Sequence, residues 1–158
     1  MNDWRQLLRD HYDDPYHRGA CDVPTHAGVA DCDEGPCQLG FELCVDPSAK
    51  VVQAWFDGSG CETCEALASV LAGFCEGWSL NELLQLNAEK LQLGLGLANA
   101  DLWNSSPCTW LPWQALQAAI ANPLDSDLAH GDLAHGDFAQ GDITDGPSFG
   151  GPSLREEC

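Results

Sequence analysis

Apolar residues recur at helical spacing at the start of the chain. The positions that share one face are Trp4, Leu7, Leu8 and Tyr12. Asn2 or Asp3 stands just before them and can cap the first turn of a helix. The residue before a proline is pushed out of the α region, so Asp14-Pro15 ends this helix. The pattern therefore predicts a first helix over about residues 4–14.

Strict alternation of apolar and polar residues begins at Gln38. One face would hold Leu39, Phe41, Leu43 and Val45, and the other Gly40, Glu42 and Cys44. The tripeptide 46–48 (Asp-Pro-Ser) is typical of a turn, and residues 51–56 predict a second strand. The sequence thus predicts an antiparallel hairpin. Residues 13–36 are rich in Asp, Pro and Gly and predict mainly loop, with a short strand near Val29.

Helical spacing returns after the hairpin. Gly58-Ser59-Gly60 is expected to end the second strand, and a helix is predicted to start near Cys61. Ser79 and Glu82 form the capping-box pattern of a further helix. Residues 88–107 show no clear period. A last helix is predicted from Cys108 to just before Pro123.

The composition changes after Pro123. Residues 125–158 hold six Asp, two Glu and one Arg, a net charge of −7, and residues 127–146 among them repeat every five positions (DLAHG, DLAHG, DFAQG, DITDG). The whole chain has 158 residues and a net charge of −19, so residues 1–124 carry the other −12. We therefore expect a folded domain over 1–124 and a disordered acidic tail over 125–158.

The acidity also limits the classes of partner. Phosphate binding needs clustered Lys and Arg, so nucleic acid and anionic membranes are not expected as partners. No apolar run approaches the roughly 18 residues of a membrane span. The first residues lack the apolar segment of a secretory signal, and a cytoplasmic location is expected.

Nine cysteines stand out in a chain with these features. Their odd number and the lack of an export signal argue against a disulfide framework and favour metal, sulfur or thiol chemistry. Cys37 precedes the first hairpin strand, Cys61 follows the glycine-rich turn, and Cys108 precedes the last helix. Helix N-termini stabilise thiolates, which are the ligands that zinc and iron–sulfur clusters require.

Four segments together resemble one known family. They are LLRDHYDDPYHRG, GPCQLGFEL, AWFDGSGCETCEALAS and CTWLPWQALQAAI. In this order, and over about residues 4–122, they resemble the NifU-like N-terminal domains, the iron–sulfur scaffold family that includes IscU and SufU. Each segment carries a family feature: a helix that ends before a proline, a cysteine leading into a strand, a Gly-x-Gly-Cys turn, and a cysteine before the last helix.

The resemblance implies a fold and a function. The implied fold is α+β, a small antiparallel sheet of about three strands packed against several helices, as in SufE and NifU-like proteins. The implied function is a scaffold for iron–sulfur cluster assembly, or a zinc-bound sulfur acceptor of the SufU kind. Sulfur would come from a cysteine desulfurase, and sulfur or cluster would pass to apo iron–sulfur proteins. Such a protein is a scaffold more than an enzyme, although a sulfurtransferase role is described for the SufU kind.

The resemblance also implies the site. Cys37, Cys61 and Cys108 match the three family cysteines and are the candidate ligands of Zn²⁺ or a transient [2Fe–2S] cluster. Cys37 is also the candidate persulfide acceptor. The family Asp two residues after the first cysteine is Leu39 here, and Pro107 replaces the His or Lys before the third cysteine. A tetrahedral site would therefore need another fourth ligand.

Cys64 is the candidate for that fourth position. It follows Cys61 by three residues, so on a helix the two side chains face the same side. The alternative is that Cys64 only packs in the core. Cys75 is 14 residues from Cys61, about 21 Å along a helix, and cannot join the same ion. The weaker candidates are Cys21, Cys32 and Cys44, and Cys158 is expected to be a thiol without a role.

The sequence alone leaves two other functions open. The loss of the family Asp would suit a degenerate member that holds only structural zinc or no metal. The Cys61-x-x-Cys64 motif after a strand would suit a thiol oxidoreductase. In that second case Cys61 and Cys64 alone would reduce a disulfide, and Cys37 and Cys108 would be dispensable.

Overall fold

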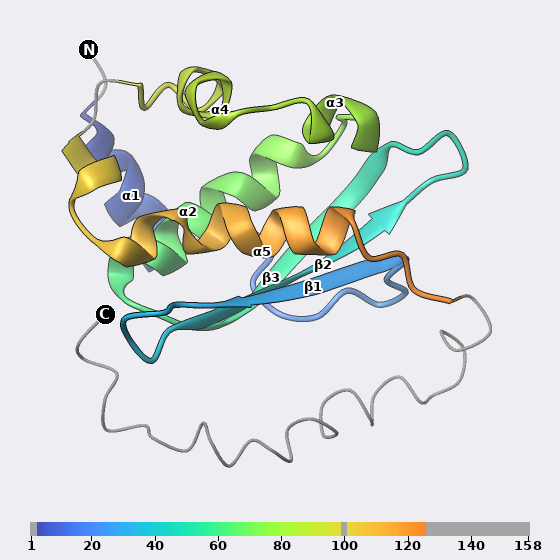
Figure 1. Ribbon diagram of the computed structural model, residues 1–158, viewed down its shortest axis with the longest axis horizontal. Coiled ribbons are helices and arrows are strands. Elements are labelled where there is room, and N and C mark those ends of the chain that lie inside the picture. Colours follow the sequence, from blue (N-terminus) through green and yellow to red (C-terminus); the bar gives the residue numbers. More distant parts are fainter. Residues whose placement is uncertain (1–2, 99–100, 126–158) are drawn as a thin grey trace.

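A three-stranded antiparallel sheet forms one layer of the protein, and helices cover one of its faces (Figure 1). The structure is a computed structural model and describes residues 3–98 and 101–125. The strands are β1 (His26–Asp31), β2 (Gln38–Val45) and β3 (Val51–Ser59), in the order β1-β2-β3. The helices are α1 (Trp4–Asp13), α2 (Glu62–Cys75), α3 (Leu80–Leu84), α4 (Ala88–Gly94) and α5 (Leu111–Ile120). Two 3₁₀ helices, η1 (Asp101–Asn104) and η2 (Pro107–Trp110), precede α5. The predicted α+β class is confirmed.

The alternation along β2 places its apolar residues under the helices. Leu39, Phe41 and Leu43 are at most 1% exposed and form the centre of the core. The strand predicted near Val29 is also present, as β1, and it pairs with β2 in antiparallel register. Because side chains alternate between the two faces of a strand, the sheet has one apolar face and one polar face.

The second hairpin strand is longer than the sequence predicts. β3 continues through Gly58 to Ser59, so the glycines do not end it at Phe56. Gly58 pairs with Leu39 and has φ +138°, and a Cβ there would lie 2.2 Å from the carbonyl oxygen of Gln38. Glycine is needed because the strands approach too closely for a side chain, and it prolongs the pairing instead of breaking it.

Helix α5 lies across β1 and β2 on the apolar face of the sheet (Figure 1). At Gly28 a Cβ would lie 2.2 Å from the backbone nitrogen of Ala119, so the helix backbone rests directly on the strand. Leu116 and Ala119 are fully buried in this contact. The last helix begins later than predicted, at Leu111, because residues 107–110 form η2.

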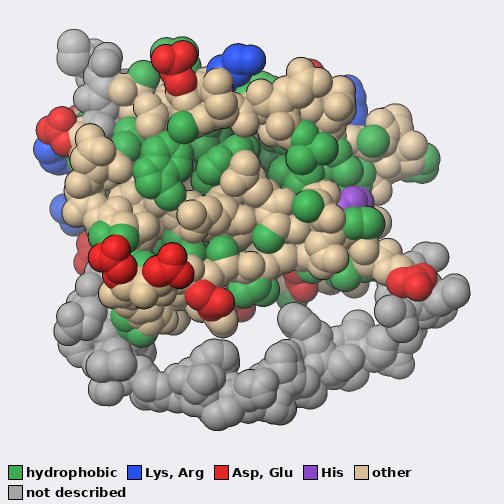
Figure 2. Space-filling view, viewed as in Figure 1, with side chains coloured by type: hydrophobic (Ala, Val, Ile, Leu, Met, Phe, Trp, Pro, Cys, Tyr) green, Lys and Arg blue, Asp and Glu red, His purple; other side chains and the backbone are tan. Residues whose placement is uncertain are grey.

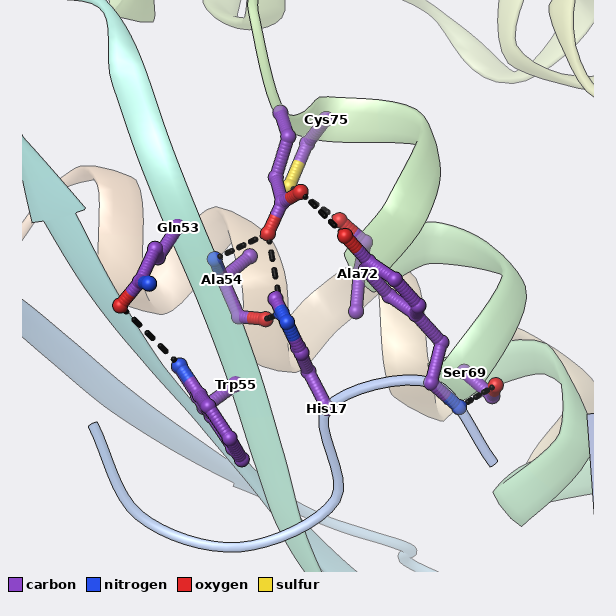
Figure 3. Close-up of polar contacts among 9 residues, drawn as sticks. His17, Gln53, Ala54, Trp55, Ser69, Ala72 and Cys75 are labelled. Atoms are coloured by element: carbon purple, nitrogen blue, oxygen red, sulfur yellow. Dashed lines mark hydrogen bonds and ion pairs between the residues drawn. The ribbon is translucent and has the colours of Figure 1, made fainter. Parts of the chain in front are cut away.

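Helix α1 packs against α2 and is anchored to it through a buried hydroxyl. The side chain of Asp3 caps α1, as the sequence predicts. Ser69 is fully buried in α2, and its Oγ lies 2.7 Å from Nδ1 of His11. The same oxygen accepts a hydrogen bond from the backbone N–H of Tyr16 at 2.7 Å (Figure 3). These bonds fix the end of α1 and the loop that follows it.

That loop closes the outer edge of β3. The N–H of Phe56 donates to the carbonyl of His17 at 3.1 Å, and the N–H of Gly19 donates to the carbonyl of Phe56 at 2.8 Å. The His17 ring stacks between Tyr16 and Trp55, with centroids 4.0 and 4.4 Å away. Figure 3 shows His17 beside Trp55. The unpaired backbone groups of an exposed edge strand can pair with another chain. The loop after α1 takes up these groups at Phe56 of β3.

Glu76, just after α2, joins this loop to the sheet. One carboxylate oxygen accepts the Tyr16 hydroxyl at 2.7 Å, and the other accepts the N–H of Ala54 at 3.0 Å and lies 3.0 Å from Nδ1 of His17. The hydrogen bond to Glu76 is the main cause that raises the pKa of Tyr16. The loop, β3 and the end of α2 are therefore held as one unit.

Within the described residues, no helix is long and apolar enough to span a membrane. The capping box predicted at Ser79 and Glu82 is present at the start of α3. The predicted boundary at 124/125 has no test in the structure. From residue 126 onward the expected acidic tail lies outside the described residues.

The contact at Gly28 generates a prediction about stability. Gly28→Ala places a methyl group into the α5 backbone and should lower the free energy of unfolding by about 2 kcal/mol, as overpacking does. The control is Gly73→Ala in α2, where the new Cβ meets Tyr16 at an ordinary 3.6 Å. That change should raise stability by about 0.5–1 kcal/mol. Urea unfolding midpoints measure both effects, and an unchanged midpoint for Gly28→Ala would contradict the packing of α5.

Candidate functional site

Four cysteines from distant parts of the sequence come together at one end of the sheet. The β1–β2 turn, the start of α2 and the η2 segment before α5 all lie at that end (Figure 1). The sulfurs of Cys37, Cys64 and Cys108 lie within 4.8 Å of one another, and those of Cys37 and Cys108 are 3.5 Å apart. All three residues are at most 3% exposed. Cys61 adjoins them through its hydrogen bond with Cys64.

The turn between β3 and α2 leaves space beside these sulfurs. A Cβ on Gly60 would lie 2.9 Å from the Cβ of Cys64, 3.3 Å from its Sγ and 3.7 Å from the Cβ of Cys37. A side chain at this position would press on the cysteine cluster. Gly60 is thus required by the close approach of the turn to the cluster.

Glu65 holds the same turn in place. One of its carboxylate oxygens accepts the N–H of Gly60 at 3.2 Å, and the other pairs with Nη1 of Arg18 at 2.6 Å. Arg18 in turn donates from Nη2 to the carbonyl of Gly58 at 2.9 Å. The hydrogen bond to Glu65 is the main cause that raises the pKa of Arg18. This chain of contacts fixes the backbone on which Cys61 stands.

Cys108 is positioned by its neighbours in η2 and by α2. Ser106 caps η2, and its Oγ accepts the N–H of Cys108 at 3.1 Å. The Sγ of Cys64 lies 3.1 Å from the carbonyl oxygen of Cys108, within hydrogen-bond distance. The first turn of α2 is therefore tied directly to the segment that carries Cys108.

Cys61 and Cys64 differ in acidity although they stand one turn apart. A hydrogen bond from the Cys64 side chain is the main cause that lowers the pKa of Cys61 to about 6, and backbone N–H groups at the start of α2 add to this effect. Burial works in the opposite direction. The pKa of Cys64 is raised by the same hydrogen bond and by its own burial. The lowered pKa favours the thiolate form of Cys61, and the raised pKa favours the protonated form of Cys64.

The structure brings four of the predicted site residues together at one end of the sheet. Cys37 and Cys108 are adjacent, and Cys64, expected as a fourth ligand, lies within the triad. Cys61 is partly exposed at the N-cap of α2 and contacts the triad through Cys64. The assignment of these four residues as ligands stays a prediction. Leu39, which replaces the family Asp, is fully buried in the core and offers no ligand atom.

Sequence reasoning underrated one cysteine. The sulfur of Cys32 lies 3.3 Å from that of Cys108, although Cys32 precedes Cys108 by 76 positions. The signal was present in the hairpin register, because Asp31 pairs with Gln38 and the next pair inward to the turn is Cys32 with Cys37. That register follows from β1, whose ends the sequence did not define.

The other described cysteines lie elsewhere. Cys75 is fully buried at the far end of α2, where burial raises its pKa to about 12. Cys44 alternates with the core residues of β2 and is partly exposed on the opposite face. Burial is the main cause that raises the pKa of Cys21. Cys158 lies outside the described residues.

The chemistry of the cluster is that of soft metal ions. Several thiols at mutual distances below 5 Å can bind zinc or an iron–sulfur cluster as thiolates. Acidic side chains gather over the same end of the molecule (Figure 2), and Asp31, Asp33 and Glu34 are exposed there. Their negative charge attracts cations.

The strand order bears on the alternative of a thiol oxidoreductase. In the described residues β3 follows β2 through an antiparallel hairpin, without the βαβ crossover in which a thioredoxin-type Cys-x-x-Cys motif stands. The likeness to such enzymes is therefore confined to the spacing of Cys61 and Cys64 and to the low pKa of Cys61.

Comparison with known proteins agrees with this fold. Residues 3–126 match the family model described as the NifU-like N terminal domain. No curated protein matches the chain. The chain is also similar to 39 solved chains, of which three follow.

A hypothetical protein, solved by crystallography, has a TM-score of 0.61 at 23% identity, covering 75% of this chain and 97% of its own. A candidate iron–sulfur cluster assembly scaffold protein for the SUF system from Fervidobacterium islandicum AW-1 has a TM-score of 0.56 at 15% identity, covering 73% of this chain and 94% of its own. The N-terminal part of a nitrogen-fixing NifU-like protein from Brucella abortus has a TM-score of 0.59 at 13% identity, covering 75% of this chain and 92% of its own. At these identities the three structures show the shared fold.

The difference in thiol acidity between Cys61 and Cys64 can be measured by alkylation. In reduced, metal-free protein, the rate of modification of Cys61 by iodoacetamide should rise through pH 6 and level off above pH 7, because only the thiolate reacts. In Cys64→Ala the midpoint should move up toward the ordinary thiol value, since the hydrogen bond is lost. Peptide mass spectrometry resolves the sites. A midpoint that stays near 6 in Cys64→Ala would show that Cys64 does not set the acidity of Cys61.

Proposed function

This chain belongs to the family of NifU-like N-terminal domains, and from that premise we propose that it is an iron–sulfur cluster assembly scaffold. The cargo is held by Cys37, Cys61 and Cys108, with Cys64 as the fourth thiolate. The observation that carries the proposal is the buried triad of Cys37, Cys64 and Cys108, whose sulfurs lie within 4.8 Å of one another. The names of two solved relatives, one for the SUF system and one NifU-like, support the same function.

The thiol cluster suits a cargo that is bound and later released. Bound thiolates replace the water around a metal, and a nearly dry site strengthens their electrostatic attraction to it. Cys61 is partly exposed, so one side of the cluster faces solvent while the triad is covered. A cluster built on this side can reach an acceptor protein without unfolding the core.

Zinc is the other occupant that the same thiolates would bind. Four cysteine thiolates form a closed tetrahedral zinc site of the structural type. In a SufU-like role, zinc would organise the site for sulfur transfer. In a degenerate member, it would only stabilise the fold. Both roles use the same residues, so the identity of the bound metal distinguishes them from cluster assembly.

Sulfur entry is the second part of the proposal. A cysteine desulfurase would present a persulfide, and a thiolate of this chain would attack its outer sulfur. One S–S bond breaks and another forms, and the desulfurase cysteine leaves as a thiolate, so the transfer is redox-neutral. Reduction of that sulfur to sulfide takes two further electrons, which a thiol or an electron-carrier protein must supply.

Two cysteines are candidates for the acceptor of this sulfur. The sequence predicts Cys37, which is 3% exposed, whereas Cys61 is partly exposed at the start of α2. Exposure favours Cys61 as the first acceptor, with Cys37 as a ligand deeper in the cluster. The acidic residues at this end require that the desulfurase dock with a neutral or basic face. Apo iron–sulfur proteins are the proposed recipients.

Metal retention tests the proposal. Protein purified without oxygen should bind iron and sulfide, or zinc, in stoichiometric amounts. Cys37→Ser and Cys108→Ser should each weaken binding by at least about tenfold, since each removes a ligand from the buried triad. Metal analysis, absorption spectra after cluster reconstitution and competition with a chelator provide the measurement.

Cys44→Ser is the matched control, because Cys44 lies on the opposite face of β2 and should keep full binding. Stoichiometric metal in both Cys37→Ser and Cys108→Ser would overturn the site. Zinc that is never replaced by an iron–sulfur cluster under reconstitution would favour the degenerate or SufU-like role over cluster assembly.

A further inference from the structure

We propose that Cys32 is a fifth thiol of this site and takes the ligand position of Cys61, beside Cys37, Cys64 and Cys108, when Cys61 leaves the metal. Cys61 is then available to accept sulfur while the metal stays fully coordinated. The inference rests on the proposed function, because it takes the thiol cluster to be a metal site. It goes further by assigning a ligand at a position that the family resemblance does not supply.

The hairpin register places Cys32 beside Cys37. β1 and β2 pair from His26 with Leu43 to Asp31 with Gln38, and one step further Cys32 faces Cys37. The N–H of Cys32 donates to the carbonyl of Cys37 at 2.9 Å, so the pairing continues past the last strand residue. Side chains of directly opposed residues lie on the same face of a sheet. Cys32 and Cys37 therefore point to the face that α5 covers.

The sulfur distances fit a shared metal. Thiolates on one tetrahedral ion, with bonds of about 2.3 Å, have sulfurs about 3.8 Å apart. The sulfur of Cys108 is 3.3 Å from Cys32 and 3.5 Å from Cys37. Cys32 lies outside the triad whose sulfurs are all within 4.8 Å of one another, so its side chain must move toward that triad to join the same ion. Cys108 thus stands between two cysteines of the hairpin and is the centre of the set.

Leu39, two residues after Cys37, contributes no ligand to this end of the sheet. It is fully buried under the helices and has no ligand atom. Cys32 approaches Cys108 from the neighbouring strand end, at the same end of the sheet. Its partial exposure, unlike the burial of the triad, places it at the open side of the cluster. Cys32 thus brings a further sulfur to the cluster from just beyond the end of β1.

Five thiols around four ligand positions allow exchange. Cys61 is hydrogen-bonded to Cys64, and the sulfurs of both Cys61 and Cys32 stand outside the triad whose sulfurs are all within 4.8 Å of one another. When Cys61 takes a sulfur atom, Cys32 keeps the fourth position filled. When Cys61 returns, either thiol can leave. This arrangement separates the residue that receives sulfur from the residues that hold the metal.

Zinc K-edge X-ray absorption on the full chain tests this assignment, with zinc as the probe. Cys61→Ser should keep four sulfur ligands, because Cys32 takes the position that Cys61 leaves. Cys61→Ser with Cys32→Ser should fall to three sulfurs and one oxygen or nitrogen, and bind at least about tenfold more weakly. Cys61→Ser with Cys44→Ser is the matched control and should keep four sulfurs.

Three results would overturn the inference. A fall to three sulfurs in Cys61→Ser alone, or four sulfurs kept in the Cys61→Ser, Cys32→Ser protein, would show that Cys32 is not a ligand although the metal site stands. Zinc retained with unchanged affinity by Cys37→Ser and Cys108→Ser would instead show that the proposed function itself fails. Cys61→Ser with Cys32→Ala repeats the key variant without a hydroxyl, and circular dichroism checks that each variant is folded.

Discussion

The direct contact between α5 and β1 is the constraint on which the site depends. Gly28 has no side chain, and a Cβ there would overlap the backbone of Ala119. The helix can therefore rest on the strand, and its preceding segment reaches the end of the sheet where β2 starts. Cys108 and Cys37 meet there with sulfurs 3.5 Å apart although they are 71 positions apart in the sequence. If the helix stood further from the sheet, the cysteines would belong to separate surfaces.

A second set of contacts sets the chemistry of the cluster. Gly60 leaves the space into which Cys64 points, and Glu65 ties that turn to Arg18. The start of α2 then holds one acidic and one protonated thiol next to each other. In the proposed function the buried triad provides ligands, and the partly exposed Cys61 and Cys32 give access from solvent. Coordination and sulfur chemistry can thus occupy two sides of the same cluster.

Local patterns made much of the fold predictable. The alternation in β2, the cap at Asp3 and the capping box at Ser79 each follow from neighbouring residues, and each is present as predicted. The end of β3 was misjudged because Gly58 is required by its close pairing with β2, a strand that is near in space but not next to it in the sequence. For the same reason the sequence underrated Cys32. Its place depends on the register between β1 and β2, which no short motif encodes. The cysteines at element boundaries were found because family motifs mark them.

Anomalous diffraction from crystals of the metal-loaded protein, grown without oxygen, tests the central claim most directly. Data collected on both sides of the iron or zinc absorption edge locate the metal independently of any assumption about ligands. The account predicts anomalous density enclosed by the sulfurs of Cys37, Cys64 and Cys108, with metal–sulfur distances of about 2.3 Å. Density confined to the acidic surface, or none at all near these three sulfurs in stoichiometrically loaded protein, would contradict it.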